Sequence, residues 1–157
     1  MRIVIRLPKN RLRPGTLQLF GDDGLEVLRG SALGLADRDD AREMGNPSGN
    51  PLRVYGDTPS GQYLGAVLAT CLRPQRSYGA FPPISLNPMS GQALQAKLNG
   101  RRSLLIHSGD LGLQGTLRPT HGCVRIHPAT HQALVEALGA RRRSAVPVSI
   151  EESEDQR

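Results

Sequence analysis

Hydrophobic and polar positions alternate along the first part of the chain, and this alternation predicts short β-strands. Residues 2–7 alternate arginine with aliphatic residues, as expected of a strand with one face in water. Residues 17–20 and 25–28 are apolar runs joined by a Gly-Asp-Asp-Gly turn, which predicts a hairpin. Residues 31–35 predict a further strand. The pattern therefore favours a mainly β protein, a sheet or a sandwich.

The pattern changes at residues 37–50, which are polar, charged and rich in turn residues. They predict a long surface loop, with one exposed helical turn at 38–43 as the alternative. Three aspartates here (Asp37, Asp39 and Asp40) lack the complete ligand series of a calcium loop, so we interpret the segment as solvated. A short strand is expected at 52–55.

Periodicity in the rest of the chain predicts two helices among further strands. The residues at 78–88 include three prolines, which favours a loop. Helical spacing and stop signals predict helices over 90–98 and 128–138. The remaining extended segments are 62–72, 103–107, 124–126 and 145–150.

Composition indicates one domain, over residues 1–150, followed by a polar tail at 151–157 that we expect to be disordered. The 157 residues are 38% hydrophobic, with 3% aromatic residues and no tryptophan. The core must therefore consist mainly of leucine, valine, isoleucine and alanine.

The net charge of +6 favours polyanionic partners such as nucleic acid, anionic lipid or an acidic cell-wall polymer. The basic residues are dispersed apart from Arg141 to Arg143, as on a solvated surface. A non-enzymatic basic module would depend on that run, but the aromatic platforms of single-strand binders are nearly absent. We therefore expect no nucleic-acid partner.

The N-terminal residues contain only a five-residue apolar-rich stretch, interrupted by Arg6 and Pro8. This is too short for a signal sequence or a membrane span, so no stable membrane insertion is expected. Three alternatives remain: the protein stays in the cytosol, it leaves by a route without a cleaved signal, or a leader precedes this sequence.

The segment 104–127 carries the candidate chemistry, with three of the four histidines and one of the two cysteines. An apolar strand delivers His107 at its end, and Cys123 directly precedes another short strand. Two strand ends joined by a loop can bring an imidazole and a thiol together, and a neighbouring imidazole lowers the pKa of a thiol. Cys123 is the expected nucleophile, with the N–H groups of Gly122 and Cys123 as candidate oxyanion donors.

Two segments resemble a known family. His107-Ser108, followed by Thr120-His121-Gly122-Cys123-Val124-Arg125, resembles the pattern of the YkuD-type L,D-transpeptidase catalytic domain. Thr58-Pro59-Ser60-Gly61-Gln62-Tyr63 is similar to an upstream segment of that family. The resemblance covers roughly residues 18–138. The spacer before Thr120 is short for the family, and Ser108 stands where the family usually has glycine.

This resemblance implies a single L,D-transpeptidase-like domain that acts on peptidoglycan stem tetrapeptides in the periplasm or cell envelope. His107 would be the general base, taking the proton of the Cys123 thiol and later activating the acceptor amine. Cys123 would attack the carbonyl at the L-centre of diaminopimelate, expel the terminal D-alanine and form a thioester. An amine acceptor would give transpeptidation, water would give L,D-carboxypeptidase activity, and a D-amino acid would give exchange. An antibacterial effector with an immunity protein as partner is a variant of the same chemistry. No cofactor is implied.

The resemblance also suggests roles for neighbouring residues. Ser108 is expected to orient His107 through its backbone carbonyl, and Thr120 to take part in positioning. His121 either completes the site or positions the loop. Arg125 either pairs with a substrate carboxylate or braces the loop, and Tyr63 is expected to contact substrate.

Other reactive residues receive simpler interpretations. His127 and His131 are expected at the surface, and Cys71 as a buried apolar residue, with both cysteines reduced. A zinc site formed by His107, His121, Cys123 and His127 is the alternative to an enzyme nucleophile. Its ligand spacing does not match structural zinc sites, so no metal is expected.

Overall fold

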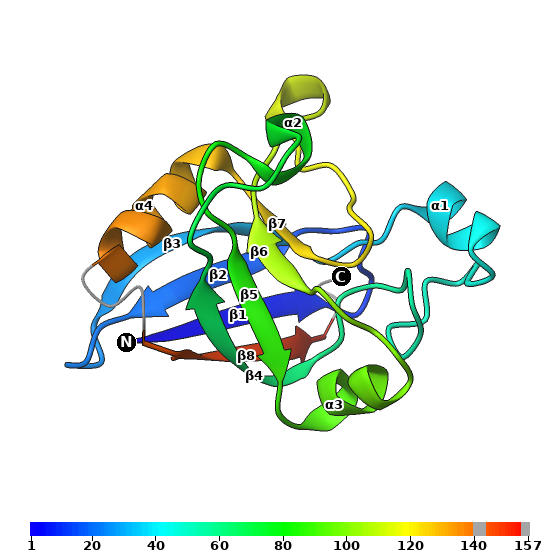
Figure 1. Ribbon diagram of the computed structural model, residues 1–157, viewed down its shortest axis with the longest axis horizontal. Helices are drawn as coiled ribbons and strands as arrows, with labels where there is room; N and C mark the ends of the chain where they lie inside the picture. The colour runs from blue at the N-terminus through cyan, green and yellow to red at the C-terminus, as the bar shows by residue number, and fades with distance from the viewer. Residues whose placement is uncertain (140–143, 155–157) are drawn as a thin grey trace.

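A closed barrel of strands forms the body of the molecule (Figure 1). The computed structural model describes residues 1–139 and 144–154. Within these residues, eight strands pair in the cyclic order β1-β2-β3-β7-β6-β5-β4-β8. Their bounds are β1 (Arg2–Pro8), β2 (Gly15–Phe20), β3 (Glu26–Leu33), β4 (Gly61–Val67), β5 (Ile84–Pro88), β6 (Leu105–His107), β7 (Val124–Ile126) and β8 (Val146–Ser153).

The prediction of a mainly β protein is confirmed, but the barrel is closed rather than an open sheet or a sandwich. Closure depends on β1, which pairs antiparallel with β2 on one side and parallel with β8 on the other. Because the first and last strands are neighbours, the sheet has no free edge there. Long-range pairing of this kind leaves no local signature in the sequence.

Short helices lie around the barrel (Figure 1). They are α1 (Arg38–Glu43), α2 (Gln75–Tyr78), α3 (Gly91–Leu98) and α4 (Pro128–Leu138), with a 3-10 turn η1 (Leu113–Gly115). The prediction of α4 is confirmed with its bounds, and α3 begins one residue later than expected. The helical alternative for 38–43 is correct, because the Asp37 side chain accepts hydrogen bonds from the first turn of α1. No signal predicted α2. Within the described residues, no helix is long and apolar enough to cross a membrane.

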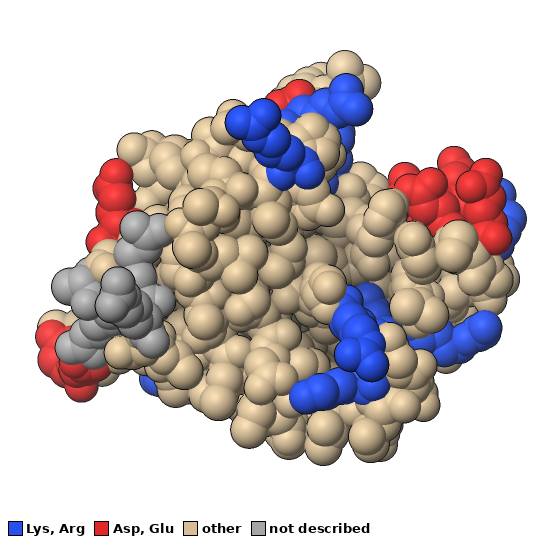
Figure 2. Space-filling view, in the orientation of Figure 1, with Lys and Arg blue, Asp and Glu red and all other residues tan. Residues whose placement is uncertain are grey.

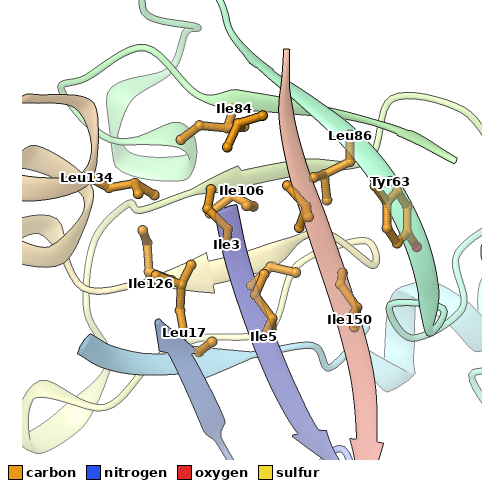
Figure 3. Packing of buried hydrophobic residues seen from close by; sticks show 14 of the residues in the cluster. Ile3, Ile5, Leu17, Tyr63, Ile84, Leu86, Ile106, Ile126, Leu134 and Ile150 are labelled. Atoms are coloured by element: carbon orange, nitrogen blue, oxygen red, sulfur yellow. The ribbon is translucent and has the colours of Figure 1, made fainter. Parts of the chain in front are cut away.

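The barrel interior is packed mainly with aliphatic side chains, as composition predicted (Figure 3). On β1, Ile3 and Ile5 point inward and are fully buried, as the alternation of that strand requires. Leu134 enters the same core from α4. Each such side chain contributes about 1.5–3 kcal/mol by leaving water.

Several predicted segments differ from the structure. Residues 31–35 form no further strand, because β3 runs without a break to Leu33, and the extended segment predicted at 62–72 ends with β4 at Val67. Residues 52–55 form turns instead of a strand, because Arg53 and Gly56 donate backbone bonds three residues back and Tyr55 has a φ of 61°. The predicted loop at 78–88 contains β5, which pairs with β4 and β6. The expected tail does not begin at residue 151, because β8 continues to Ser153 alongside β1. Residues 155–157 and the run from Arg141 to Arg143 lie outside the described residues.

The pairing of β6 with β7 positions the candidate site. These strands are parallel neighbours, with Ile106 opposite Val124 and His107 opposite Arg125. Cys123 precedes β7 by one position, so the pairing brings it beside the strand that carries His107. The sequence predicted both strands but not their parallel pairing.

Candidate active site

A surface cavity of about 450 Å³ contains both candidate catalytic side chains. Of the residues predicted for the site, His107, Thr120, His121, Cys123 and Arg125 line it. The other lining residues are Asp37, Asp40, Ser77, Tyr78, Arg118 and Pro119. Thus the structure brings together residues from three distant parts of the chain.

A second cavity, of about 440 Å³, shares Tyr78, His121 and Cys123 with the first. Its other lining residues are Val54, Tyr55, Leu72, Arg101, Arg102, Ser103, Leu104 and Leu105. The thiol therefore lies where two cavities meet.

His107 is buried and held in a defined orientation. Its Nδ1 atom lies 2.7 Å from the carbonyl oxygen of Ser108. A carbonyl oxygen only accepts, so Nδ1 carries the proton and Nε2 has the lone pair that a general base needs. Burial lowers the pKa of His107 to about 4, although the hydrogen bond to Ser108 acts in the opposite direction. The imidazole is therefore neutral near pH 7.

Cys123 is in a different state from the activated thiolate expected from the sequence. Burial raises the pKa of its thiol, while the Leu105 N–H and the charges of Arg101 and Arg125 act to lower it. The thiol is 3.7 Å from the Ser103 carbonyl oxygen. A neutral His107 supplies no positive charge to stabilise a thiolate. The resting site thus pairs a neutral thiol with a neutral base.

The loop that carries Cys123 is fixed by hydroxyl groups. The Thr120 Oγ1 atom accepts a 3.0 Å hydrogen bond from the Gly122 N–H and donates one of 3.0 Å to the Cys123 carbonyl oxygen. This positions the loop, as suggested for Thr120. It also occupies the Gly122 N–H, which would have to leave Thr120 before it could donate to an oxyanion. The Cys123 N–H is the remaining predicted donor.

Gly122 is required by its neighbours. Its φ is +114°, and an added Cβ would overlap the Arg101 guanidinium and the Gly56 carbonyl oxygen. Arg101 is buried and donates to the carbonyl oxygens of Pro51 and Asp57, each at 2.7 Å, and of Gly56 at 2.9 Å. Sequence reasoning missed Arg101, since nothing distinguishes it from the other arginines.

Arg125 braces the backbone beside His107. Its Nη1 atom donates to the Ser77 carbonyl oxygen at 3.2 Å and to the Ser108 carbonyl oxygen at 3.0 Å. Only 3% of its surface is exposed. These contacts favour the bracing alternative over a surface site for a carboxylate.

Two residues lie elsewhere than expected. Tyr63 belongs to the barrel core rather than to the substrate site, because β4 turns it inward and its hydroxyl donates to the Pro59 carbonyl oxygen at 2.6 Å. His131 was expected at the surface but is fully buried. Its spacing from Leu134 and Leu138 places it on the buried face of α4, a signal that the sequence did contain.

His121 lies at the rim, where the two cavities meet. Its side chain is exposed, its Nε2 is 3.0 Å from an oxygen of Asp40, and its ring packs 5.0 Å from that of Tyr55. Tyr78, which the sequence did not single out, packs its ring 5.2 Å from His107. His121 and Tyr78 are the two aromatic residues that both cavities share with Cys123.

The remaining reactive residues form no further site. Within the described residues, no three histidine, cysteine or acidic side chains are placed to hold a metal ion. Cys71 is half-buried instead of buried, and its thiol donates to the Ala80 carbonyl oxygen at 3.2 Å. His127, also half-buried, precedes α4.

Comparisons with known proteins identify the fold. Searches of protein-family models and of curated proteins found no match. Among solved structures, the chain is similar to Bd1075 from Bdellovibrio bacteriovorus, with 20% identity and a TM-score of 0.54 over 95% of this chain and 47% of that one. It is also similar to the helical cell shape determining protein Pgp2 from Campylobacter jejuni, with 17% identity and a TM-score of 0.55 over 98% of this chain and 49% of that one. The chain thus spans about half the length of each and shares its fold with both.

Proposed function

We propose that this protein is a cysteine-dependent L,D-transpeptidase that acts on peptidoglycan stem tetrapeptides in the periplasm or cell envelope. The observation that carries the proposal is the placement of two side chains at one cavity. His107, whose Nδ1–H is held by the Ser108 carbonyl, ends β6, and Cys123 directly precedes the parallel neighbour β7. The sequence pattern around these residues is similar to that of YkuD-type domains. One solved structure with this fold is described as determining cell shape.

The neutral resting state defines the order of proton transfers. As Cys123 attacks the carbonyl carbon, Nε2 of His107 takes the thiol proton, and the resulting imidazolium protonates the leaving D-alanine amine. The thioester remains on Cys123. An incoming amine or water then gives a proton to His107 as it attacks, and the thiol is restored. The Cys123 N–H is a donor for the developing oxyanion.

The two cavities give the donor and the acceptor separate approaches to the sulfur. Charges of both signs line the first cavity. Asp37 is the N-cap of α1, Asp40 lies within that helix, and Arg118 lies in the loop before β7. Figure 2 shows acidic side chains gathered at α1 and basic side chains at the end of the molecule that carries α2. Such a site suits peptides that bear both amino and carboxylate groups.

Incubation with a purified disaccharide-tetrapeptide tests the proposal. Intact mass should show an adduct on Cys123 equal to the donor minus D-alanine, or else free D-alanine should accumulate. A pentapeptide should be a poor donor, because the scissile bond follows an L-centre. Cys123→Ser should abolish turnover, whereas the matched Cys71→Ser variant should retain it.

The product then identifies the acceptor. Dimers indicate cross-linking, tripeptide indicates L,D-carboxypeptidase activity, and a changed fourth residue indicates exchange. Either of the last two would fit an effector that damages a rival cell wall and is neutralised by an immunity protein. Absence of both adduct and D-alanine with every stem peptide would contradict the proposal.

A further inference from the structure

His131 is buried beneath the candidate site, with both ring nitrogens engaged. Nε2 lies 2.9 Å from the Pro82 carbonyl oxygen, and Nδ1 lies 2.8 Å from the Ser108 hydroxyl. Because a carbonyl oxygen only accepts, Nε2 carries the proton and Nδ1 accepts from the hydroxyl. Burial lowers the pKa of His131, which favours the neutral ring that this arrangement needs.

Ser108 connects His131 to the candidate base. Its hydroxyl donates to His131, and its carbonyl oxygen accepts from Nδ1 of His107 at 2.7 Å and from Arg125 at 3.0 Å. The residue is fully buried. Fixing the hydroxyl restricts the movement of the residue whose carbonyl orients the imidazole.

Gly79 leaves the space that this connection requires. Its φ is +86°, and an added Cβ would overlap the Ser108 Oγ atom and approach Nδ1 of His131. Gly79 also ends α2, which presents Tyr78 to the ring of His107. The backbone is therefore shaped around the Ser108 hydroxyl, which would be unnecessary if only its carbonyl mattered.

We propose that His131 is a positioning residue that fixes the tautomer and orientation of His107 through Ser108. The catalytic consequence rests on the proposed function: the proton stays on Nδ1 of His107, and Nε2 remains available to the thiol. His131 itself is not one of the residues that line either cavity. The geometry assigns this side chain a role that the sequence motif does not contain.

The direct test is the nitrogen NMR spectrum of the histidine rings, which distinguishes the two tautomers without any substrate. In the unaltered protein, His107 should be a single tautomer with its proton on Nδ1. Ser108→Ala and His131→Leu should give a mixture of tautomers. His131→Gln retains one donor and one acceptor and should preserve the single tautomer. His127→Gln is the control, since it removes a histidine outside the connection.

Kinetics with the disaccharide-tetrapeptide provide the second readout. Ser108→Ala and His131→Leu should each lower kcat by about 10-fold with KM nearly unchanged, and the double variant should be no slower than either. The inference would be overturned if His107 remained a single Nδ1–H tautomer in both Ser108→Ala and a folded His131→Leu. It would also be overturned if the loss of kcat in the double variant were the product of the losses in the two single variants. If His131→Leu does not fold, Ser108→Ala and His131→Gln decide. If the unaltered protein releases no D-alanine, the proposed function fails while the NMR spectra still decide this inference.

Discussion

The hydroxyl of Thr58 donates a 2.7 Å hydrogen bond to the carbonyl oxygen of Gly122, 64 positions further along the chain. Thr58 is fully buried, and its hydroxyl also lies 3.2 Å from the Cys123 carbonyl oxygen. The segment before β4 is thus attached directly to the loop that carries the thiol. This contact explains why a Thr-Pro segment far upstream accompanies the Thr-His-Gly-Cys segment.

Thr58→Val should destabilise the protein by about 1–3 kcal/mol, because it leaves the Gly122 carbonyl oxygen buried without that donor. Urea unfolding measures the loss. Thr58→Ser keeps the hydroxyl and should lose less. Equal losses in the two variants would mean that the methyl group, which only Thr58→Val retains, contributes as much as the hydroxyl, and would contradict a dominant role of the hydrogen bond.

Gly122→Ala should lower the free energy of unfolding far more than Gly100→Ala, although both glycines have a positive φ. At Gly122 the new Cβ overlaps Arg101 and Gly56, whereas at Gly100, with a φ of +99°, it meets nothing within 4 Å. Gly100→Ala should therefore show the backbone cost alone, about 1–2 kcal/mol. Unfolding curves of the two variants separate the overlap from the strain. Equal losses would show that Arg101 can move aside.

Local patterns in the sequence predicted the elements whose own residues carry the signal for a helix or a strand. The spacing in α4 and the apolar runs of β6 and β7 required no knowledge of distant residues. Barrel closure depends on β1 meeting β8, and the turns at 52–55 are flanked by the Pro51 and Gly56 carbonyls, which accept from the distant Arg101. Neither relationship is visible until the chain is folded, so both were missed.

At the candidate site, the residue types of the motif predicted side chains that line one cavity, but not their charge states. Whether a thiol is activated depends on burial and on the protonation of its neighbours. The sequence placed His107 near Cys123, but burial raises the pKa of the thiol and lowers that of the imidazole, so the expected direction of the thiol pKa is reversed. His131 was expected at the surface because histidine is often partly exposed, and its spacing from Leu134 and Leu138 was not taken into account.

The buried His107 should make stability depend on pH. Its pKa falls from an ordinary 6.5 to about 4 on folding, so between these values the unfolded chain binds more protons than the folded one. Stability is therefore full above pH 6.5 and decreases as the pH falls towards 4, by about 3 kcal/mol for this group. His131 contributes in the same direction. Urea unfolding from pH 7 to 4.5 should show a smaller decrease for His107→Gln, and parallel curves would contradict the assignment.

Alkylation should report the raised pKa of Cys123. In a Cys71→Ser background, the rate with iodoacetamide should continue to rise above pH 9, because burial raises the thiol pKa above its ordinary value of 9.0. Mass spectrometry of timed samples gives the rates. A plateau already reached below pH 8 would instead demonstrate an activated thiolate and favour the state first expected from the sequence.

Variants at Arg125 can show whether this residue braces the backbone or binds a substrate carboxylate. One nitrogen, Nη1, makes both hydrogen bonds to Ser77 and Ser108, so a lysine ammonium could replace it. If Arg125 is a brace, Arg125→Lys should nearly retain kcat, and Arg125→Met should lower kcat by about 10–100-fold with little change in KM.

A carboxylate-binding Arg125 would give a different pattern with the same variants. KM for the tetrapeptide donor would then rise, and the rise would vanish for a donor whose free diaminopimelate carboxylate is amidated. Steady-state release of D-alanine from the two donors measures both parameters. Because Arg125 is almost fully buried and already bonded to two carbonyl oxygens, we expect the loss in kcat, equal for both donors.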